Sequence, residues 1–95
     1  MPRFHLHIRT PGGLIEDEEG IEFVDQAAAI VEAVRGARSL MIGEVTAGTL
    51  CFDQSIEIHD AAGKHLNSVP FSDAVRLVAA PEPARQIGGA DRTRP

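Results

Sequence analysis

Two histidines separated by one residue, His5 and His7, are the residues whose type and spacing could do chemistry. They lie in FHLHIR, residues 4–9, where apolar and polar residues alternate. Residues two apart in a strand point to the same face of a sheet, so this pair could offer two imidazoles to one metal ion. The segment 54–59 alternates in the same way and ends on a further histidine. If the two segments are neighbouring strands, we predict a zinc site formed by His5, His7 and His59 as one alternative.

The other interpretation of these histidines needs no metal. An antiparallel sheet can leave one face in water, and alternating polar residues are typical of that face. Arg3 and Arg9 would share the face with the histidines, and their positive charges disfavour a nearby cation. Both interpretations stay open from the sequence.

A run of four acids interrupts the apolar residues of LIEDEEGIEF, residues 14–23. A calcium-binding EF-hand loop has a fixed glycine at its sixth position and acidic ligands at its first and twelfth. If Gly20 is that glycine, the two positions are Ile15 and Gln26, so the pattern fails. We expect a solvated loop that could attract a basic protein partner through long-range charge. The candidate partner-binding residues are Glu16, Asp17, Glu18 and Glu19.

No sequence pattern indicates an enzyme. Cys51 lies between Leu50 and Phe52, a setting in which a free cysteine usually behaves as a small hydrophobic residue. The sequence contains no nucleophile elbow, phosphate-binding loop, dinucleotide fingerprint or paired cysteines. We expect no catalytic residue and no cofactor.

Composition limits the classes of partner. The 95 residues carry a formal net charge of -5, which disfavours phosphate backbones and anionic membranes. The four aromatic residues are all Phe, so no Trp or Tyr is available to stack on bases. No apolar run approaches the roughly 18–20 residues that span a bilayer. A single cysteine cannot form an internal disulfide, so we expect a cytoplasmic protein. From the charge, the aromatic residues and the short apolar runs, we expect it to bind neither nucleic acid nor membrane.

The periodicity of the chain predicts two hairpins around one helix. TPGG, residues 10–13, is a turn signal after the first strand. Asp25 is a helix N-cap and Gly48 a helix end, and the residues between them repeat every three or four positions. The expected buried stripe of this helix is Ala27, Ile30, Val34, Ala37, Met41 and Val45.

The second hairpin is expected from two strands joined by DAAGK, residues 60–64. Ile56 and Ile58 should point inward, and Pro70 indicates a bulge or an edge strand. A short helical turn capped by Ser72 could follow. Residues 1–80 are predicted to form a single domain, and residues 81–95, rich in proline, glycine and arginine, a disordered tail. The predicted fold is α+β: a two-layer ββαββ arrangement with one long helix on one face of an antiparallel sheet.

The strings MPRFHLHIR, LIEDEEGIEF, DQAAAIVEA and IEIHDAAGKHLNSVPFSDAVRL together resemble a family of short bacterial proteins catalogued as a domain of unknown function. The resemblance covers residues 1–78. The first strand of that family is often richer in aromatic residues, where this chain has His5 and Leu6. The resemblance implies the fold and no activity, cofactor or catalytic residue.

The expected function is that of a small noncatalytic interaction or regulatory module. Its partner would be another protein or a second copy of the chain, because a free sheet edge can pair to form a homodimer. The metal-binding protein is the alternative. The negative charge also permits a toxin-neutralising or DNA-mimicking role.

Overall fold

The first hairpin forms where the alternation of residues predicts it. In the computed structural model, which describes residues 1–79, β1 (Arg3–Thr10) turns into β2 (Gly13–Ile15). The two strands are antiparallel, and Ile8 lies opposite Ile15. The hydroxyl of Thr10 accepts a hydrogen bond from the backbone N–H of Gly12 at 3.1 Å, which closes the turn.

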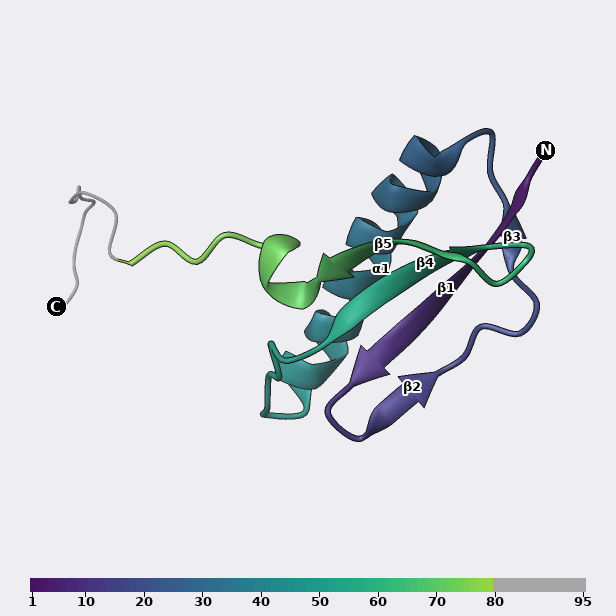
Figure 1. Ribbon diagram of the computed structural model, residues 1–95. Coiled ribbons are helices and arrows are strands. Elements are labelled where there is room, and N and C mark those ends of the chain that lie inside the picture. The colour runs from purple at the N-terminus through teal and green to yellow at the C-terminus, as the bar shows by residue number, and fades with distance from the viewer. Residues whose placement is uncertain (80–95) are drawn as a thin grey trace, which may run out of the picture.

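β1 is an inner strand of the sheet. β4 (Ser55–Asp60) pairs with it antiparallel, and β5 (His65–Pro70) pairs with β4, so the strand order is β2-β1-β4-β5. The two-residue strand β3 (Ile21–Glu22) pairs with the beginning of β1, on the edge where β2 pairs with its end. Figure 1 shows this open sheet with the helix across one of its faces. The predicted α+β fold is confirmed, with β3 as an addition.

The helix α1 (Gln26–Thr46) starts at the predicted cap. The carboxylate of Asp25 accepts a hydrogen bond from the backbone N–H of Ala28 at 2.9 Å. Such a bond satisfies one of the amide groups that the first turn of a helix leaves unpaired. At the other end, the backbone N–H of Gly48 donates to the carbonyl of Val45 at 3.0 Å.

The buried stripe of α1 agrees with the predicted one at Ala37 and Met41 and differs from it elsewhere. Its fully buried residues are four apart, whereas Ala27 and Val45 are exposed and Ile30 and Val34 are half-buried at the sides. Alanine allows the helix axis to approach the sheet closely, so the row of small residues takes the centre and the larger side chains flank it. The four buried residues of α1 are Ala29, Ala33, Ala37 and Met41.

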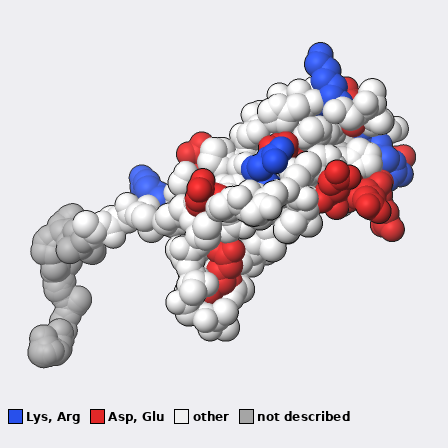
Figure 2. All heavy atoms as spheres, turned by 60° about the horizontal axis from the view of Figure 1, so that its bottom comes forward, with Lys and Arg blue, Asp and Glu red and all other residues white. Residues whose placement is uncertain are grey.

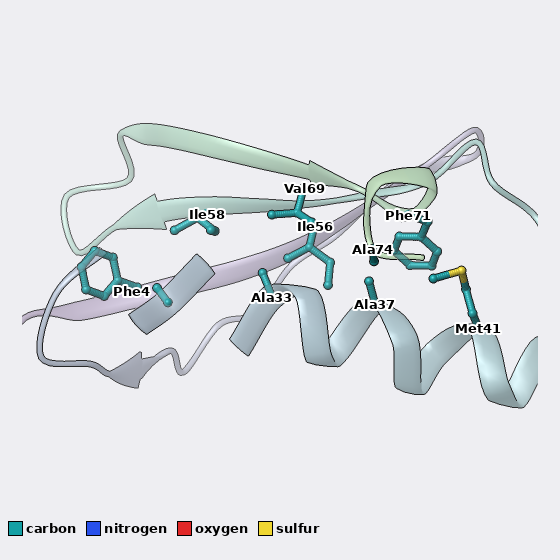
Figure 3. Close-up of a cluster of buried hydrophobic side chains, with 10 residues drawn as sticks. Phe4, Ala33, Ala37, Met41, Ile56, Ile58, Val69, Phe71 and Ala74 are labelled. Atoms are coloured by element: carbon teal, nitrogen blue, oxygen red, sulfur yellow. The ribbon is translucent and has the colours of Figure 1, made fainter. Parts of the chain in front are cut away.

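The core lies between α1 and the helix-facing side of the sheet (Figure 3). Phe71 and Ile58 are its largest fully buried side chains. Figure 3 shows Ala37 and Met41 of α1 directed toward Phe71. Ile56 and Ile58 point inward, as predicted.

β5 is an edge strand with an irregular register, as Pro70 indicated. The pairing with β4 shifts between Ile58 and His59, and this bulge lets both Leu66 and Val69 contact the core despite their odd spacing. A 3-10 turn, η1 (Phe71–Asp73), follows directly.

The predicted cap of this turn is wrong. Pro70 precedes η1, and Ser72 lies inside it and makes no capping bond. The predicted disordered tail, residues 81–95, lies outside the described residues. Among residues 1–79, no helix is both long and apolar enough to cross a membrane.

Candidate functional site

All four histidines of the chain lie on the sheet face that α1 leaves open. His5 and His7 project from β1 on the side opposite Phe4, which is buried against the helix. In the β1–β4 register, His5 lies opposite His59, and His59 in turn lies opposite His65 of β5. The predicted neighbourhood of His5, His7 and His59 is therefore present.

The rings form a continuous row. The centroids of His5 and His7 are 6.0 Å apart, those of His7 and His59 4.5 Å, and those of His59 and His65 5.2 Å. The sequence pattern did not predict His65 on this face, because the bulge in β5 breaks the alternation of that strand. The name histidine row is used below for His5, His7, His59 and His65.

One acid of the loop between β2 and β3 is bound to β1. The carboxylate of Asp17 accepts hydrogen bonds from the backbone N–H of Leu6 at 3.1 Å and of Gly20 at 3.1 Å. Burial of this carboxyl raises its pKa, but the two backbone hydrogen bonds and the nearby His5 outweigh burial, so the pKa is lowered overall. Asp17 therefore ties the loop to the sheet instead of facing water.

Gly20 completes the tie. Its φ is +74°, and a Cβ atom there would lie 2.8 Å from the carbonyl oxygen of Phe4. Arg3 donates to the carbonyl oxygens of Glu19 at 2.9 Å and Gly20 at 3.2 Å. Only glycine lets the chain pass so close to β1 in this conformation.

The backbone of Asp17 also determines which ring nitrogen carries the proton in two histidines. Nδ1 of His5 lies 2.7 Å from the carbonyl oxygen of Asp17, so this nitrogen must donate. Nδ1 of His7 accepts the backbone N–H of Asp17 at 2.9 Å, so the proton of His7 sits on Nε2. Burial, and then the neighbouring His59, lower the pKa of His7, which favours this neutral form.

Both ring nitrogens of His59 lie within hydrogen-bond distance of an acceptor oxygen, and the neutral ring can donate to one of the two at a time. Nδ1 lies 3.2 Å from the carbonyl oxygen of Gly63 and Nε2 lies 3.1 Å from Oε1 of Glu57. Arg9 donates from Nε to Oε2 of Glu57 at 2.8 Å. The hydrogen bonds from Arg9 and His59 hold the pKa of Glu57 below its usual value. Glu57 is thus an ion-pair partner on the open face.

The geometry bears directly on the predicted zinc site. Within residues 1–79, no three His, Cys, Asp or Glu side chains are placed to hold a metal ion. A neutral imidazole binds metal through its unprotonated nitrogen. In His7 that nitrogen is occupied by the Asp17 N–H, and both nitrogens of His59 face acceptors. Zinc would have to displace these hydrogen bonds, and the site stays a prediction.

A shallow pocket of about 430 Å³ lies between the loop and the histidine row. His5, His7 and His59 line it together with four acids, and no Lys or Arg of residues 1–79 does. Oδ1 of Asp60 accepts the N–H groups of Ala62 and Lys64 in its own turn at 2.9 and 2.8 Å. Of the four acids, Glu16 and Glu18 are the two whose carboxylates accept no hydrogen bond from residues 1–79.

Three of the four candidate partner-binding acids are exposed as predicted, namely Glu16, Glu18 and Glu19. Asp17 is the half-buried exception. Figure 2 shows acidic side chains gathered at one end of the molecule, the end where Figure 1 places the loop between β2 and β3. The loop therefore presents a negative surface next to the pocket.

Cys51 is exposed, so its predicted role as a small hydrophobic residue is wrong.

The edge strand β5 is a poor template for pairing, because Pro70 has no N–H and the N–H of Ser68 donates to the side chain of Asn67 at 2.7 Å. A homodimer formed by pairing of β5 edges finds little support here.

The fold and the site define a class: a small two-layer α+β protein whose open sheet face carries an acidic, histidine-lined pocket. Residues 3–72 match the domain of unknown function DUF6894. Since this match covers most of the chain, the protein belongs to that family. No curated protein and no solved structure matches the chain.

Proposed function

We propose that this protein is a noncatalytic interaction module that binds a basic protein partner at the pocket between the acidic loop and the histidine row. The observation that carries the proposal is the composition of the pocket wall, in which the part of the chain that the structure describes places carboxylates and imidazoles together and no Lys or Arg. An arginine or lysine side chain of a partner would supply the missing positive charge.

The chemistry of the pocket suits a guanidinium group. Glu16 and Glu18 are exposed and form no hydrogen bond or ion pair through their side chains with residues 1–79. The rings of His5 and His7 are stacked at an angle of 28°, which offers planar surfaces beside these carboxylates. A planar cation can pair with the carboxylates and stack on an imidazole at the same time.

The arrangement of the acids and Cys51 is consistent with a binding role. Cys51 lies in the loop before β4, whereas His59 lies near the other end of that strand. The titratable groups that are strongly hydrogen-bonded, Asp17 and Glu57, are held in their charged forms by structural partners. We place this module in a bacterial cytoplasm, which is supported by the single cysteine and by the family resemblance.

Calorimetric titration with a short arginine-rich peptide tests the proposal. We expect binding that weakens with added salt, and no binding of the matched peptide in which citrulline replaces each arginine. The double variant Glu16→Gln/Glu18→Gln should weaken binding by about tenfold, since each rim pair contributes up to about 1 kcal/mol. Equal binding of both peptides, or no binding of either, would overturn the proposal.

Glu32→Gln provides the matched control. Glu32 lies on α1, on the opposite layer, and its ion pair with Arg35 is exposed. This substitution removes one negative charge, as each single substitution of the double variant does, without touching the pocket. We expect its affinity for the arginine-rich peptide to equal that of the parent chain.

Metal binding by His5, His7 and His59 is the second candidate. It is favoured by the 4.5 Å separation of the His7 and His59 rings and by the position of His5 on the same face. Zinc titration of protein purified without a histidine tag, compared with the His5→Ala/His7→Ala variant, tests it. Indistinguishable isotherms would remove this candidate.

A further inference from the structure

An apolar groove of about 400 Å³ lies at the C-terminal end of α1. The last turns of the helix, the loop before β4 and the segment after η1 form its walls. Ile42 is 67% exposed, Val45 58% and Leu77 76%. Contiguous apolar surface of this kind on a small protein marks an interaction site.

The groove is bordered by positive charge without a partner. Among residues 1–79, the cations that form no ion pair are Arg38, Lys64 and Arg76. Arg38 lines the groove, and its Nε donates to the carbonyl oxygen of Ala74 at 2.6 Å. Arg76 follows directly after Val75 and precedes Leu77, which both line the groove. A complementary surface would therefore be apolar and acidic.

The opposite end of the same molecule offers such a surface. Ile15 lies opposite Ile8 and Ile21 lies opposite Phe4, so both point toward the helix side of the sheet, beyond the cover of α1. They are 58% and 52% exposed. Three exposed acids lie between them in the chain: Glu16, Glu18 and Glu19. The name acidic edge is used below for residues 15–21.

We propose that the groove receives the acidic edge of a second copy of this chain. Figure 1 places the loop between β2 and β3 and the turn η1 at opposite ends of the molecule, so one copy does not bring its own two surfaces together. The sequence of residues 80–95 contains a single large apolar residue, Ile87. Asp17 holds the acidic edge in one conformation, which lowers the entropy cost of docking.

The contact is head-to-tail. A head-to-tail contact joins two different surfaces, so in a dimer one copy keeps a free groove and the other keeps a free edge. Further copies can therefore add at both ends unless a ring closes. This inference rests in part on the proposed function, because the second copy would supply the basic partner through Arg38 and Arg76. It adds the groove, which the proposed function does not use.

Sedimentation velocity over a concentration series tests the contact. We expect the mass of the parent chain to rise with concentration and to fall with added salt. The groove variant Val45→Asp and the edge variant Glu18→Lys/Glu19→Lys should each remain monomeric, with Kd raised by more than about tenfold. A one-to-one mixture of the two variants should form a dimer and nothing larger, because one intact groove meets one intact edge.

Val31→Asp is the matched control for the groove. Val31 is also an exposed valine on α1, at 60%, and it does not line the groove. We expect this variant to assemble like the parent chain. Circular dichroism and thermal unfolding show whether each variant is folded.

Three results would overturn the inference: a parent chain that stays monomeric, an edge variant that assembles alone, or a mixture that remains monomeric. Binding of the arginine-rich peptide separates this failure from failure of the proposed function. At concentrations where the parent chain is monomeric, Val45→Asp should bind that peptide as tightly as the parent chain, since Val45 is not part of the acidic pocket.

Discussion

The carboxylate of Asp17 accepts the backbone N–H of Leu6 at 3.1 Å, at the place on β1 between its pairing with β2 and its pairing with β3. The side chain thus accepts the hydrogen bond that a neighbouring strand would accept at this point of the sheet edge. Its second oxygen accepts the N–H of Gly20 and shapes the loop. The side chain of Asp17 therefore joins the loop to the sheet edge, and its backbone joins the loop to the histidine row.

Asp17→Ala should destabilise the fold by about 1–3 kcal/mol, because the backbone N–H groups of Leu6 and Gly20 lose a charged acceptor. Urea unfolding followed by circular dichroism measures this change. Glu18→Ala is the control, since Glu18 is exposed and should change stability by less than about 0.5 kcal/mol. Equal stability of the two variants would show that the tie to β1 contributes nothing.

Acid should weaken the fold through the same carboxyl group. The pKa of Asp17 is lowered in the folded protein, because the hydrogen bonds from Leu6 and Gly20 outweigh the effect of burial. The unfolded value is about 3.9, so the stabilisation is complete above this pH and is lost as the pH falls through the lower folded pKa. The pKa of Glu57 is also lowered, chiefly by Arg9, and acts in the same direction.

Unfolding midpoints measured from pH 7 downward test this dependence. Asp17→Asn lacks the titrating group, so its stability should approach that of the parent chain below about pH 4 and differ most at neutral pH. Parallel curves for the two proteins at all pH values would contradict the assignment.

Gly20→Ala should be more damaging than Gly63→Ala. Both glycines have positive φ, +74° and +87°, so alanine is strained at either position. Only at Gly20 does the new Cβ meet backbone, the carbonyl oxygen of Phe4 at 2.8 Å, while nothing lies within 4 Å of the corresponding atom at Gly63. We expect an additional loss of roughly 1–3 kcal/mol at Gly20, measured by urea unfolding. Equal losses would mean that the loop can move away from β1.

Much of the fold could be predicted from local sequence signals. The alternation in residues 4–9, the Asp25 cap and the inward Ile56 and Ile58 each follow from the geometry of a strand or helix end, which depends on near neighbours. The shared face of His5, His7 and His59 followed from the same alternation once β1 and β4 were taken as neighbours.

The remainder depends on contacts that a sequence does not display. The central stripe of α1 moved to Ala29 and Ala33, because close packing on the sheet favours small residues over the largest apolar ones. Asp17 looks like its acidic neighbours, yet only its position opposite Leu6 brings its carboxylate to β1. His65 reached the histidine row through a bulge whose place no local signal marked.

Ala33→Leu tests the tight contact between α1 and the sheet. Ala33 is fully buried in the core, so a larger side chain has to displace its neighbours, at a cost of about 1–3 kcal/mol. Ala27→Leu adds the same atoms at an exposed position of the same helix and should change stability by less than about 0.5 kcal/mol. Thermal unfolding of both variants measures the difference. Equal melting temperatures would argue against the observed stripe.

His5 and His7 should be opposite tautomers at neutral pH, although they are two residues apart on one strand. His5 donates from Nδ1 to the carbonyl oxygen of Asp17, and His7 accepts the N–H of Asp17 at Nδ1. Nitrogen-15 NMR of the side chains distinguishes the two forms, and we expect protonated Nδ1 in His5 and protonated Nε2 in His7. In Asp17→Pro, which lacks the N–H, His7 should lose its preference for the Nε2 form. If His7 carries its proton on Nδ1 in the parent chain, the hydrogen bond from the Asp17 N–H is contradicted. Because the Asp17 N–H occupies the nitrogen that zinc would need, the same variant should bind zinc more readily than the parent chain if the histidine row binds metal at all.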